Sequence, residues 1–166
     1  MTARFCLFCG ARLRVAVVDD RRRRRCPRCG WIDYANPVPA ATAIIIDRRR
    51  LLLGRRAHPP YAGAWDLPGG FLEPNEGPLE GLRRELREEL GVGIRSARLV
   101  GFANDHYGRN GFPVLSVVYR VQPTSHRVRP ADDVSALDWF PLTSIPYRHI
   151  AFPALRRLLR HYLASK

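Results

Sequence analysis

Long apolar runs are missing from this chain of 166 residues. No stretch reaches the 18 or more residues that a membrane-spanning helix needs, so we expect no membrane partner. The first residues, MTARFCLFCGARL, also lack the apolar core of a secretory signal peptide. Both absences favour a cytoplasmic, reducing location, in which disulfide bonds are not expected.

Lysine is almost absent as well. Lys166 is the single one, so arginine supplies nearly all of the 28 basic side chains. Against 15 acidic residues they give a formal net charge of +13. A surface of this sign attracts phosphate-bearing ligands and could bind nucleic acid in a salt-dependent way. The near-exclusive use of arginine is also typical of a biased coding composition, so charge alone does not assign a nucleic-acid partner.

Cysteine is missing beyond residue 30, and the four cysteines stand in two matching units, CLFCG and CPRCG. Cys6, Cys9, Cys26 and Cys29 have the paired Cys-x2-Cys spacing of a zinc ribbon, in which four thiolates surround one Zn²⁺. A redox dithiol would more often be a single Cys-x-x-Cys that opens a helix. Four protein ligands leave no open coordination position, so we expect this zinc to be structural.

A run of five arginines, residues 21–25, stands directly before the second cysteine unit. These side chains could contact RNA, DNA or a substrate phosphate. The alternative is a solvated loop that only reflects the arginine-rich composition of the chain. We expect this second interpretation to apply.

A second region begins at about residue 37 and mixes strand and helix patterns. Strands are expected over 41–47, around 51–56, and in ARLVGFA, PVLSVVYRV and SALDWF further along. A helix is expected over 78–90, and FPALRRLLRHYLAS has the apolar spacing of another. We therefore expect a zinc ribbon over residues 1–36 and a mixed α/β domain over residues 37–166.

Three like charges stand close together on the first expected helix, in the stretch RELREEL. At about 100° per residue, Glu85, Glu88 and Glu89 fall on one side, beside a leucine stripe that would pack into the core. Arg84 could offset part of the repulsion by pairing with Glu80 or Glu88. The pattern fits either a surface helix laced with ion pairs or a half-shell of oxygen ligands for Mg²⁺.

The residues before this helix favour the metal interpretation. Gly69 and Gly70 allow the backbone to approach a substrate or an ion closely, and Glu76 adds a fourth acid. From Gly70 onward the sequence reads Gly-x5-Glu-x7-Arg-Glu-Leu-x-Glu-Glu-x-Gly-Val. This pattern resembles the Nudix box of the Nudix hydrolases, with every defined position present. The preceding WDLPGG is also typical of that family.

The resemblance implies an α/β/α sandwich with a mixed sheet, which hydrolyses a nucleoside diphosphate linked to another moiety. Glu85, Glu88 and Glu89 would ligate a catalytic Mg²⁺ or Mn²⁺, with Glu76 supporting the metal shell and Arg84 orienting the glutamates. A metal ion of this kind lowers the pKa of a bound water, so no serine or cysteine nucleophile is needed.

The general base stays open in the sequence. A box glutamate serves in some members of the family, and an acid from a later loop serves in others. Asp133 precedes the Trp139-Phe140 pair, where several relatives place an extra metal-ligating acid, and Asp132 is its competitor. Both could equally be turn residues.

The substrate stays open too. A four-cysteine ribbon before a Nudix domain resembles NADH, FAD and ADP-ribose pyrophosphatases, but GFANDHYGRNGFPVLS stands where NADH pyrophosphatases carry SQPWPFPxS. Phe102, Tyr107 and Phe112 in or near this stretch could stack on a base or simply pack. We expect a small nucleotide substrate. A nucleic-acid-binding module on a Nudix fold, or a hydrolase of nucleotide-capped RNA, is the alternative, and family members are often homodimers.

Overall fold

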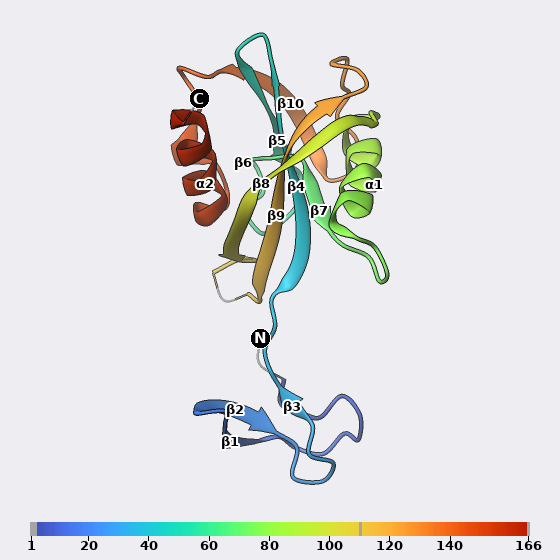
Figure 1. Cartoon of the computed structure of the whole chain (residues 1–166), viewed down its shortest axis with the longest axis vertical. Helices are drawn as coiled ribbons and strands as arrows, with labels where there is room; N and C mark the ends of the chain where they lie inside the picture. Colours follow the sequence, from blue (N-terminus) through green and yellow to red (C-terminus); the bar gives the residue numbers. More distant parts are fainter. Residues whose placement is uncertain (1–2, 110, 166) are drawn as a thin grey trace. The chain divides into compact units, whose positions relative to one another are not determined.

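The computed structural model describes residues 3–109 and 111–165, in two compact units, Met1–Pro37 and Val38–Lys166. Figure 1 shows the strands and helices of both units, and each unit has buried apolar residues of its own. None of the described helices is long and apolar enough to cross a membrane.

The first unit is a small antiparallel sheet. Its strands are β1 (Arg14–Val18), β2 (Arg21–Arg25) and β3 (Ile32–Asp33), paired in the order β1-β2-β3. The turn between β1 and β2 consists of Asp19 and Asp20, both with positive φ, which is typical of a tight hairpin. The strands therefore follow one another by short connections, as in other small hairpin units.

The expectation that the arginine run is a solvated loop was wrong. All five arginines pair with β1, from Arg21 opposite Val18 to Arg25 opposite Arg14. Arginine has no strand preference of its own, so the pairing is driven by the apolar, β-branched sequence RVAVV of β1.

The second unit is built on one mixed sheet. Its long strands are β4 (Val38–Asp47), β5 (Arg50–Arg56), β8 (Ile94–His106), β9 (Pro113–Pro123) and β10 (Val134–Pro141), in the order β10-β5-β4-β9-β8. Two short strands join it: β6 (Trp65–Asp66) pairs with β5, and β7 (Gly69–Phe71) pairs with β4. The β4–β9 pair is parallel and the other pairs are antiparallel.

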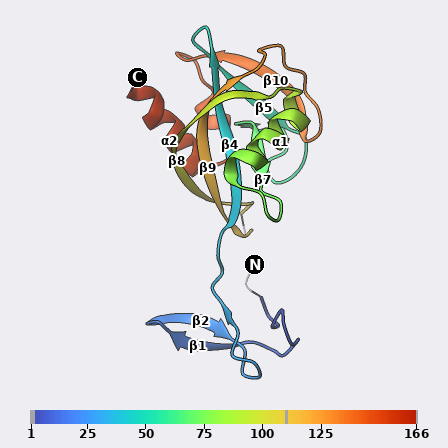
Figure 2. The ribbon, with the colours of Figure 1, turned by 45° about the vertical axis from the view of Figure 1, so that its right-hand side comes forward.

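Two α-helices cover opposite faces of this sheet, as the two views in Figures 1 and 2 agree. They are α1 (Pro78–Leu90), at the bounds expected from the sequence, and α2 (Pro153–Ala164), with a short 3₁₀ helix, η1 (Tyr147–His149), before α2. The structure thus confirms a three-layer α/β/α arrangement.

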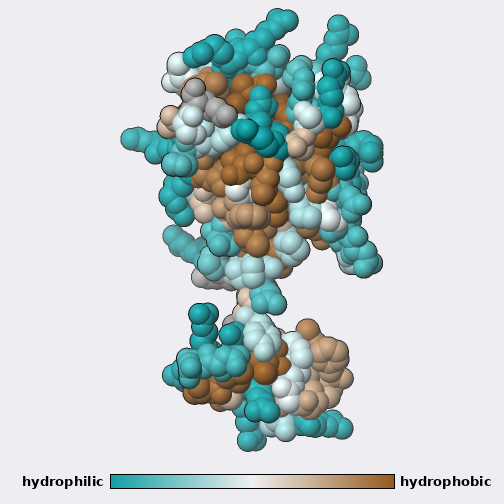
Figure 3. All heavy atoms as spheres, viewed as in Figure 1, coloured by the Kyte–Doolittle hydropathy of each residue, from teal (hydrophilic) through white to brown (hydrophobic). Residues whose placement is uncertain are grey.

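Side chains along β4 alternate between the two faces of the sheet, so this strand contributes to both cores of the second unit. Ile44 belongs to the core on the α2 side, which includes Leu159, whereas its neighbours Ala43 and Ile45 belong to the core on the α1 side, which includes Leu86. A strand buried on both faces reads as a continuous apolar run, which is why AATAIII carries no alternating pattern. Charged side chains cover much of the remaining surface, while apolar residues gather over β8 and β9 in the view of Figure 3.

Candidate functional site

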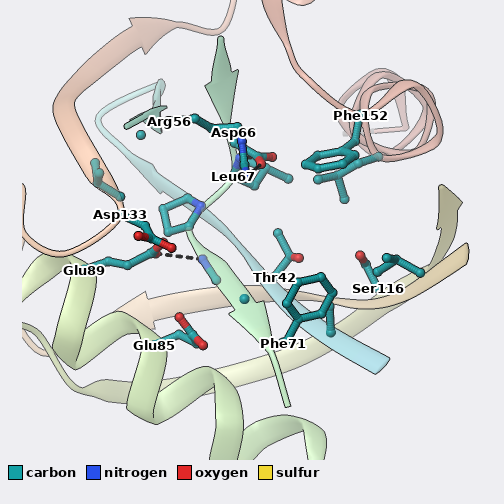
Figure 4. A pocket seen from close by; sticks show the side chains of 18 of the residues that line it. Thr42, Arg56, Asp66, Leu67, Phe71, Glu85, Glu89, Ser116, Asp133 and Phe152 are labelled. Carbon is teal, nitrogen blue, oxygen red and sulfur yellow. Dashed lines mark hydrogen bonds and ion pairs between the residues drawn. The ribbon is translucent and has the colours of Figure 1, made fainter. Parts of the chain in front are cut away.

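A cavity of about 290 Å³ lies in the second unit, where β7 and α1 meet β4 and α2 (Figure 4). Its acidic lining residues are Asp66, Glu73, Glu85, Glu88, Glu89, Asp105, Asp132 and Asp133. Arg56 and Arg84 are the arginines that line it among the described residues. The excess of carboxylates makes this cavity attractive to cations.

Local signals fix the ends of α1. Pro78 occupies the first turn, and the N–H of Gly77 donates to Oε2 of Glu80 at 2.8 Å. Gly91 adopts the left-handed conformation, and its N–H donates to the carbonyl of Arg87. Glu80 is thus engaged at the cap, and of the two partners expected for Arg84 on this helix, the structure pairs it with Glu88.

The leucine stripe of α1 sets the rotation of the helix. Leu82, Leu86 and Leu90 are buried against the sheet. Because these leucines face the sheet, the neighbouring side of the helix, which carries Glu85 and Glu89, faces the cavity. Fully burying a leucine side chain stabilises the fold by about 1.5–3 kcal/mol, which exceeds the few tenths of a kcal/mol lost to like-charge repulsion along a helix.

Glu89 is the most buried carboxylate on α1, with 7% of its surface exposed. Its Oε2 accepts the N–H of Gly69 at 2.9 Å (Figure 4). Burial raises the pKa of Glu89 to about 8, and the neighbouring Glu85 and Asp66 add to this. A carboxylate in this position is stabilised either by a proton or by a cation.

Arg84 holds the other glutamates in place. Its Nε and one Nη bind the two carboxylate oxygens of Glu76 at 2.9 and 3.0 Å. The other Nη lies 2.8 Å from Glu85 and 2.9 Å from Glu88, so the expected pairing with Glu88 is present. The guanidinium also donates to the carbonyl of Phe71, which ties α1 to β7. A planar group with several fixed donors is suited to such a clamp.

Glu76 is a hydrogen-bond partner of Arg84 and is not among the residues that line the cavity. Besides binding Arg84, Glu76 accepts the N–H of Glu73 at 2.9 Å. The hydrogen bond from Arg84 makes the largest contribution, with that from Glu73 next, to holding the pKa of Glu76 below its usual range. Burial, in contrast, raises the pKa of Glu85. The box carboxylates therefore occupy unlike environments although they are close in sequence.

Close backbone approach explains Gly69 and Gly70. Gly69 has φ of 129°, in a region that L side chains rarely adopt, and a Cβ there would overlap the carbonyl of Ala41. A Cβ on Gly70 would lie 2.6 Å from the carboxylate of Glu85. Both glycines let β7 pack between β4 and the glutamates, so that the N–H of Gly69 reaches Glu89.

The loop before β10 brings Asp132 and Asp133 to the same cavity. The N–H of Ala131 donates to the carbonyl of Glu89, which joins this loop to the end of α1. Asp133 lies beside Glu89 in Figure 4, and its Oδ1 is 3.6 Å from Nε2 of His58. Both candidate acids therefore stand near the box glutamates.

Arg56 and Asp66 are cavity residues that the sequence did not reveal. They form an ion pair at 3.2 Å, and burial raises the pKa of Asp66 to about 6 although Arg56 opposes the shift. Arg56 also donates to the carbonyl of Pro60 and to the hydroxyl of Tyr107. The two residues meet because β6 pairs with the end of β5, which no local sequence pattern predicts.

Aromatic rings, among them Phe152, stand across the cavity from Glu85 and Glu89 (Figure 4). Tyr107 stacks on Phe112 with ring centroids 5.4 Å apart and contacts Phe71 and Phe152. Phe102 does not line the cavity and is exposed on the edge strand β8. Of the three aromatic residues considered from the sequence, Tyr107 alone lines the cavity, with Phe112 packed behind it.

Asp105 has a structural partner within the cavity. Its two carboxylate oxygens accept the N–H groups of Ala154 and Leu155 at 2.8 and 3.0 Å. The N-cap residue of α2 is Phe152, which makes no side-chain cap of its own. Asp105 therefore caps α2 from a neighbouring strand and anchors the aromatic rings.

The four cysteines of the first unit converge. Their sulfur atoms all lie within 4.8 Å of one another, and Cys6–Cys29 and Cys9–Cys26 are 3.5 and 3.4 Å apart. Zn–S bonds of about 2.3 Å in a tetrahedron imply sulfur separations of about 3.8 Å, so this donor set fits zinc. The N–H of Cys29 donates to the sulfur of Cys26 and lowers the pKa of that thiol to about 6, whereas the neighbouring sulfurs raise the pKa of Cys29.

The box glutamates are arranged differently. Within the described part of the chain, only the cysteines gather their ligand atoms so tightly. Glu85 and Glu88 accept hydrogen bonds from Arg84, whereas Glu89 accepts one from the N–H of Gly69. Their carboxylates are therefore spread along the cavity wall. Hard oxygen donors in an open row suit Mg²⁺, which keeps several waters and takes further ligands from phosphates.

Comparisons with known proteins agree with this geometry. The family model described as NUDIX domain matches residues 36–162, and the zinc-ribbon model described as Nudix N-terminal matches residues 4–35. The chain belongs to the Nudix family. The family resemblance of the box, drawn from residues 70–92, is thereby confirmed over most of the chain.

Curated Nudix relatives have several activities. An NAD-capped RNA hydrolase of Chromobacterium violaceum is 29% identical over 160 residues, which are 95% of this chain but 57% of that protein. An ADP-ribose pyrophosphatase of Methanocaldococcus jannaschii is 29% identical over 133 residues, 80% of this chain and 77% of that protein. The chain thus spans little more than half of the capped-RNA hydrolase.

Solved Nudix structures share the fold. A NUDIX hydrolase from Nitrosomonas europaea has a TM-score of 0.75 and 26% identity, covering 99% of this chain and 92% of that one. A MutT NUDIX hydrolase from Burkholderia pseudomallei has a TM-score of 0.65 and 30% identity, covering 78% and 97%. The expected Nudix sandwich with a four-cysteine unit before it is confirmed.

Proposed function

We propose that this Nudix protein hydrolyses the pyrophosphate bond of a nucleoside diphosphate linked to another moiety. The observation that carries the proposal is the buried Glu89 beside Glu85 and Glu88 on one wall of the acidic cavity. A buried carboxylate with a raised pKa is costly to ionise, and a divalent cation offsets this cost.

Glu85, Glu88 and Glu89 would hold Mg²⁺ or Mn²⁺. The ion would neutralise charge on the diphosphate and lower the pKa of a bound water. Arg84 positions Glu85 and Glu88, and Glu76 in turn orients Arg84 through its two hydrogen bonds. Glu76 therefore acts as a positioning residue.

The chain's other groups shape the site for the substrate. The backbone at Gly69 and Gly70 lines the cavity and would lie near substrate phosphates, since the absence of side chains lets it pack closely against Ala41 and Glu85. Tyr107 and Phe152 offer apolar ring surface across the cavity from the acids, which suits a base. Asp133 stands beside Glu89 as a further ligand or as the general base, and its contact with His58 is the competing interaction.

The cysteine cluster would hold one structural Zn²⁺. Four thiolates fill the tetrahedral coordination of the ion, so the ribbon contributes stability and not catalysis. A cytoplasmic location suits four free thiols, and it stays a prediction, as does a homodimer.

Nucleotide-capped RNA is a second candidate substrate. The NAD-capped RNA hydrolase relatives align over 95% or more of this chain, with the ribbon included. A capped RNA end contains the same kind of pyrophosphate linkage, so both candidates use one catalytic site. A purely nucleic-acid-binding module is disfavoured by the complete set of box carboxylates.

Hydrolysis can be tested with the zinc-loaded full chain and Mg²⁺. The panel is ADP-ribose, FAD, NADH, nucleotide sugars, dinucleoside polyphosphates and NAD-capped RNA, with released phosphates separated by chromatography. We expect turnover of at least one class and a loss of at least about 100-fold in Glu89→Gln. Absence of hydrolysis across the panel, or equal rates for both proteins, would refute the proposal.

A further inference from the structure

The β1–β2 hairpin of the first unit has two unlike faces, because side chains alternate along each strand and opposed residues share a face. One face, here named the arginine face, carries Arg14, Arg21, Arg23 and Arg25, with Ala16 and Val18 between them. The other, the mixed face, carries Val15, Val17, Arg22 and Arg24. The five consecutive arginines of β2 are thus sorted three to one side and two to the other.

The charge balance of the two faces differs. Asp33 of β3 lies opposite Arg24 and so adds a carboxylate to the mixed face, whereas Ile32 lies opposite Arg25 on the arginine face. The arginine face therefore has four positive charges and no acidic residue on its strands, and acids flank it only at the turn, at Asp19 and Asp20. In Figure 3 both hydrophilic and hydrophobic residues are seen over the hairpin.

None of these four arginines forms an ion pair with a described residue, since the ion pairs of the described chain belong to the second unit. Arg14, Arg21 and Arg25 are exposed, so their guanidinium groups can bind external anions without breaking an internal ion pair. Arg21, Arg23 and Arg25 follow one another at about 6.6 Å along the strand, which makes a row of cations suited to a repeating anion.

Tyr34 gives this face an aromatic group. The guanidinium of Arg23 lies 4.6 Å from the centre of the Tyr34 ring, and the ring is 49% exposed. Stacking on the ring holds the guanidinium plane while leaving its charge intact. The Nε of Arg23 is buried without a hydrogen-bond partner among the described residues, so the stack is the contact that positions this side chain.

We propose that the arginine face, with Tyr34 beside it, binds the sugar–phosphate backbone of single-stranded nucleic acid. A row of cations with an interleaved aromatic ring is the combination that single strands need, because phosphates pair with the cations and a base stacks on the ring. This binding goes beyond hydrolysis and needs no turnover. RNA and DNA share the chemistry, and the experiment separates them.

A matched pair of double variants tests the proposal. Arg21→Gln/Arg25→Gln and Arg22→Gln/Arg24→Gln remove the same charge from the same strand, but from opposite faces. The probe is a fluorescently labelled single-stranded oligouridylate, followed by anisotropy at several salt concentrations with the zinc-loaded full chain. Binding of single strands depends on salt with a slope of about −0.7 per phosphate contact.

We expect the first variant to lose at least about fivefold in affinity and to reduce the salt slope by about 1.4, while the second stays within about twofold. Tyr34→Leu should lower affinity about fivefold with an unchanged slope, since stacking releases no ions. Equal losses in both double variants would show that only net charge matters, and no loss in either would show that these arginines do not contact the strand; each result would overturn the proposal.

Three further arms complete the test. An oligodeoxythymidylate separates RNA from DNA, and tighter binding of phosphatidylserine vesicles than of either oligonucleotide would overturn the proposal in favour of a membrane surface. Hydrolysis of a small dinucleotide is expected to be unchanged in Arg21→Gln/Arg25→Gln. Failure of the arginine face is therefore distinguishable from failure of the proposed hydrolysis.

Discussion

At the scale of single residues, burial decides what each acid of the box can do. Glu89 is buried and has a raised pKa, whereas Glu76 is held by Arg84 and has a lowered one. The same side-chain chemistry thus gives one group poised for a cation and one group that is already paired. Sequence spacing alone does not separate the two.

Glu89 makes the magnesium-free protein sensitive to pH. Its pKa is about 8 in the folded state, above the value of about 4.5 expected when unfolded. The folded state therefore binds the proton more tightly, and we expect the free energy of unfolding to fall as pH rises from about 4.5 through 8. Thermal unfolding of protein dialysed without chelator, which keeps the zinc, measures this.

Glu89→Gln is the matching control. It should flatten this dependence and should abolish the stabilisation that Mg²⁺ gives to the parent protein at pH 8. If the parent and the variant lost stability in parallel over this range, the dependence would belong to other groups.

Arg84→Lys tests the clamp. Lysine keeps the charge but cannot reach Glu76, Glu85 and Glu88 from one planar group, so we expect activity to fall about 10- to 100-fold and the Mg²⁺ requirement to rise. Rates measured against Mg²⁺ concentration report both effects. Arg87→Lys, on the exposed side of the same helix, should keep its activity. Parallel losses in the two variants would contradict the positioning role.

At the scale of elements, β7 is the most constrained segment, because it lies between β4 and α1. Gly69→Ala would place a Cβ against the carbonyl of Ala41 at positive φ, so we expect a loss of about 2 kcal/mol or more in the free energy of unfolding. Urea denaturation measures this loss.

Gly91→Ala separates backbone strain from overlap. Gly91 also has positive φ, but nothing lies within 4 Å of its Cβ position, so we expect a smaller loss of about 1 kcal/mol. If Gly91→Ala were the more damaging change, packing at β7 would not be the limiting contact.

The predictability of each element follows from where its determinants lie. The bounds of α1 were readable because Pro78, the leucine stripe and Gly91 are local signals. The strand β2 was not, because its pairing depends on β1. The partners of Arg84 were only partly readable: Glu88 lies one turn along the helix, whereas Glu76 lies outside it.

Residues of the cavity show the same limit. The box glutamates were identifiable from a continuous pattern, but Arg56, Asp66 and Phe152 reach the site only after the sheet and α2 have packed. Such convergence depends on strand pairing and not on local sequence. Asp105 is a further case, since its role as a cap for α2 depends on β8 and α2 being neighbours.

At the scale of the whole molecule, two units with separate cores predict separable stability. Removing zinc from the cysteine cluster should unfold residues 3–37 and leave α1 and β4 protected, because the second unit has its own cores. Hydrogen exchange with and without a zinc chelator measures this by segment, and metal analysis should find one zinc per chain. Loss of protection in α1 on zinc removal would show that the two units are energetically coupled.

The parallel pairing of β4 with β9 has a consequence for synthesis. β4 begins the second unit, yet its partner lies far along the chain, with Val38 opposite Val114 and Ile45 opposite Val121. Contacts of such long sequence separation form late. The first unit can fold while the ribosome is still translating. The apolar face of α1, in contrast, can complete its packing only after β9 has been synthesised. A pause in translation before residue 113 would therefore leave the helix that carries the box glutamates made but without its contacts to Val121 of β9, and open to chaperones.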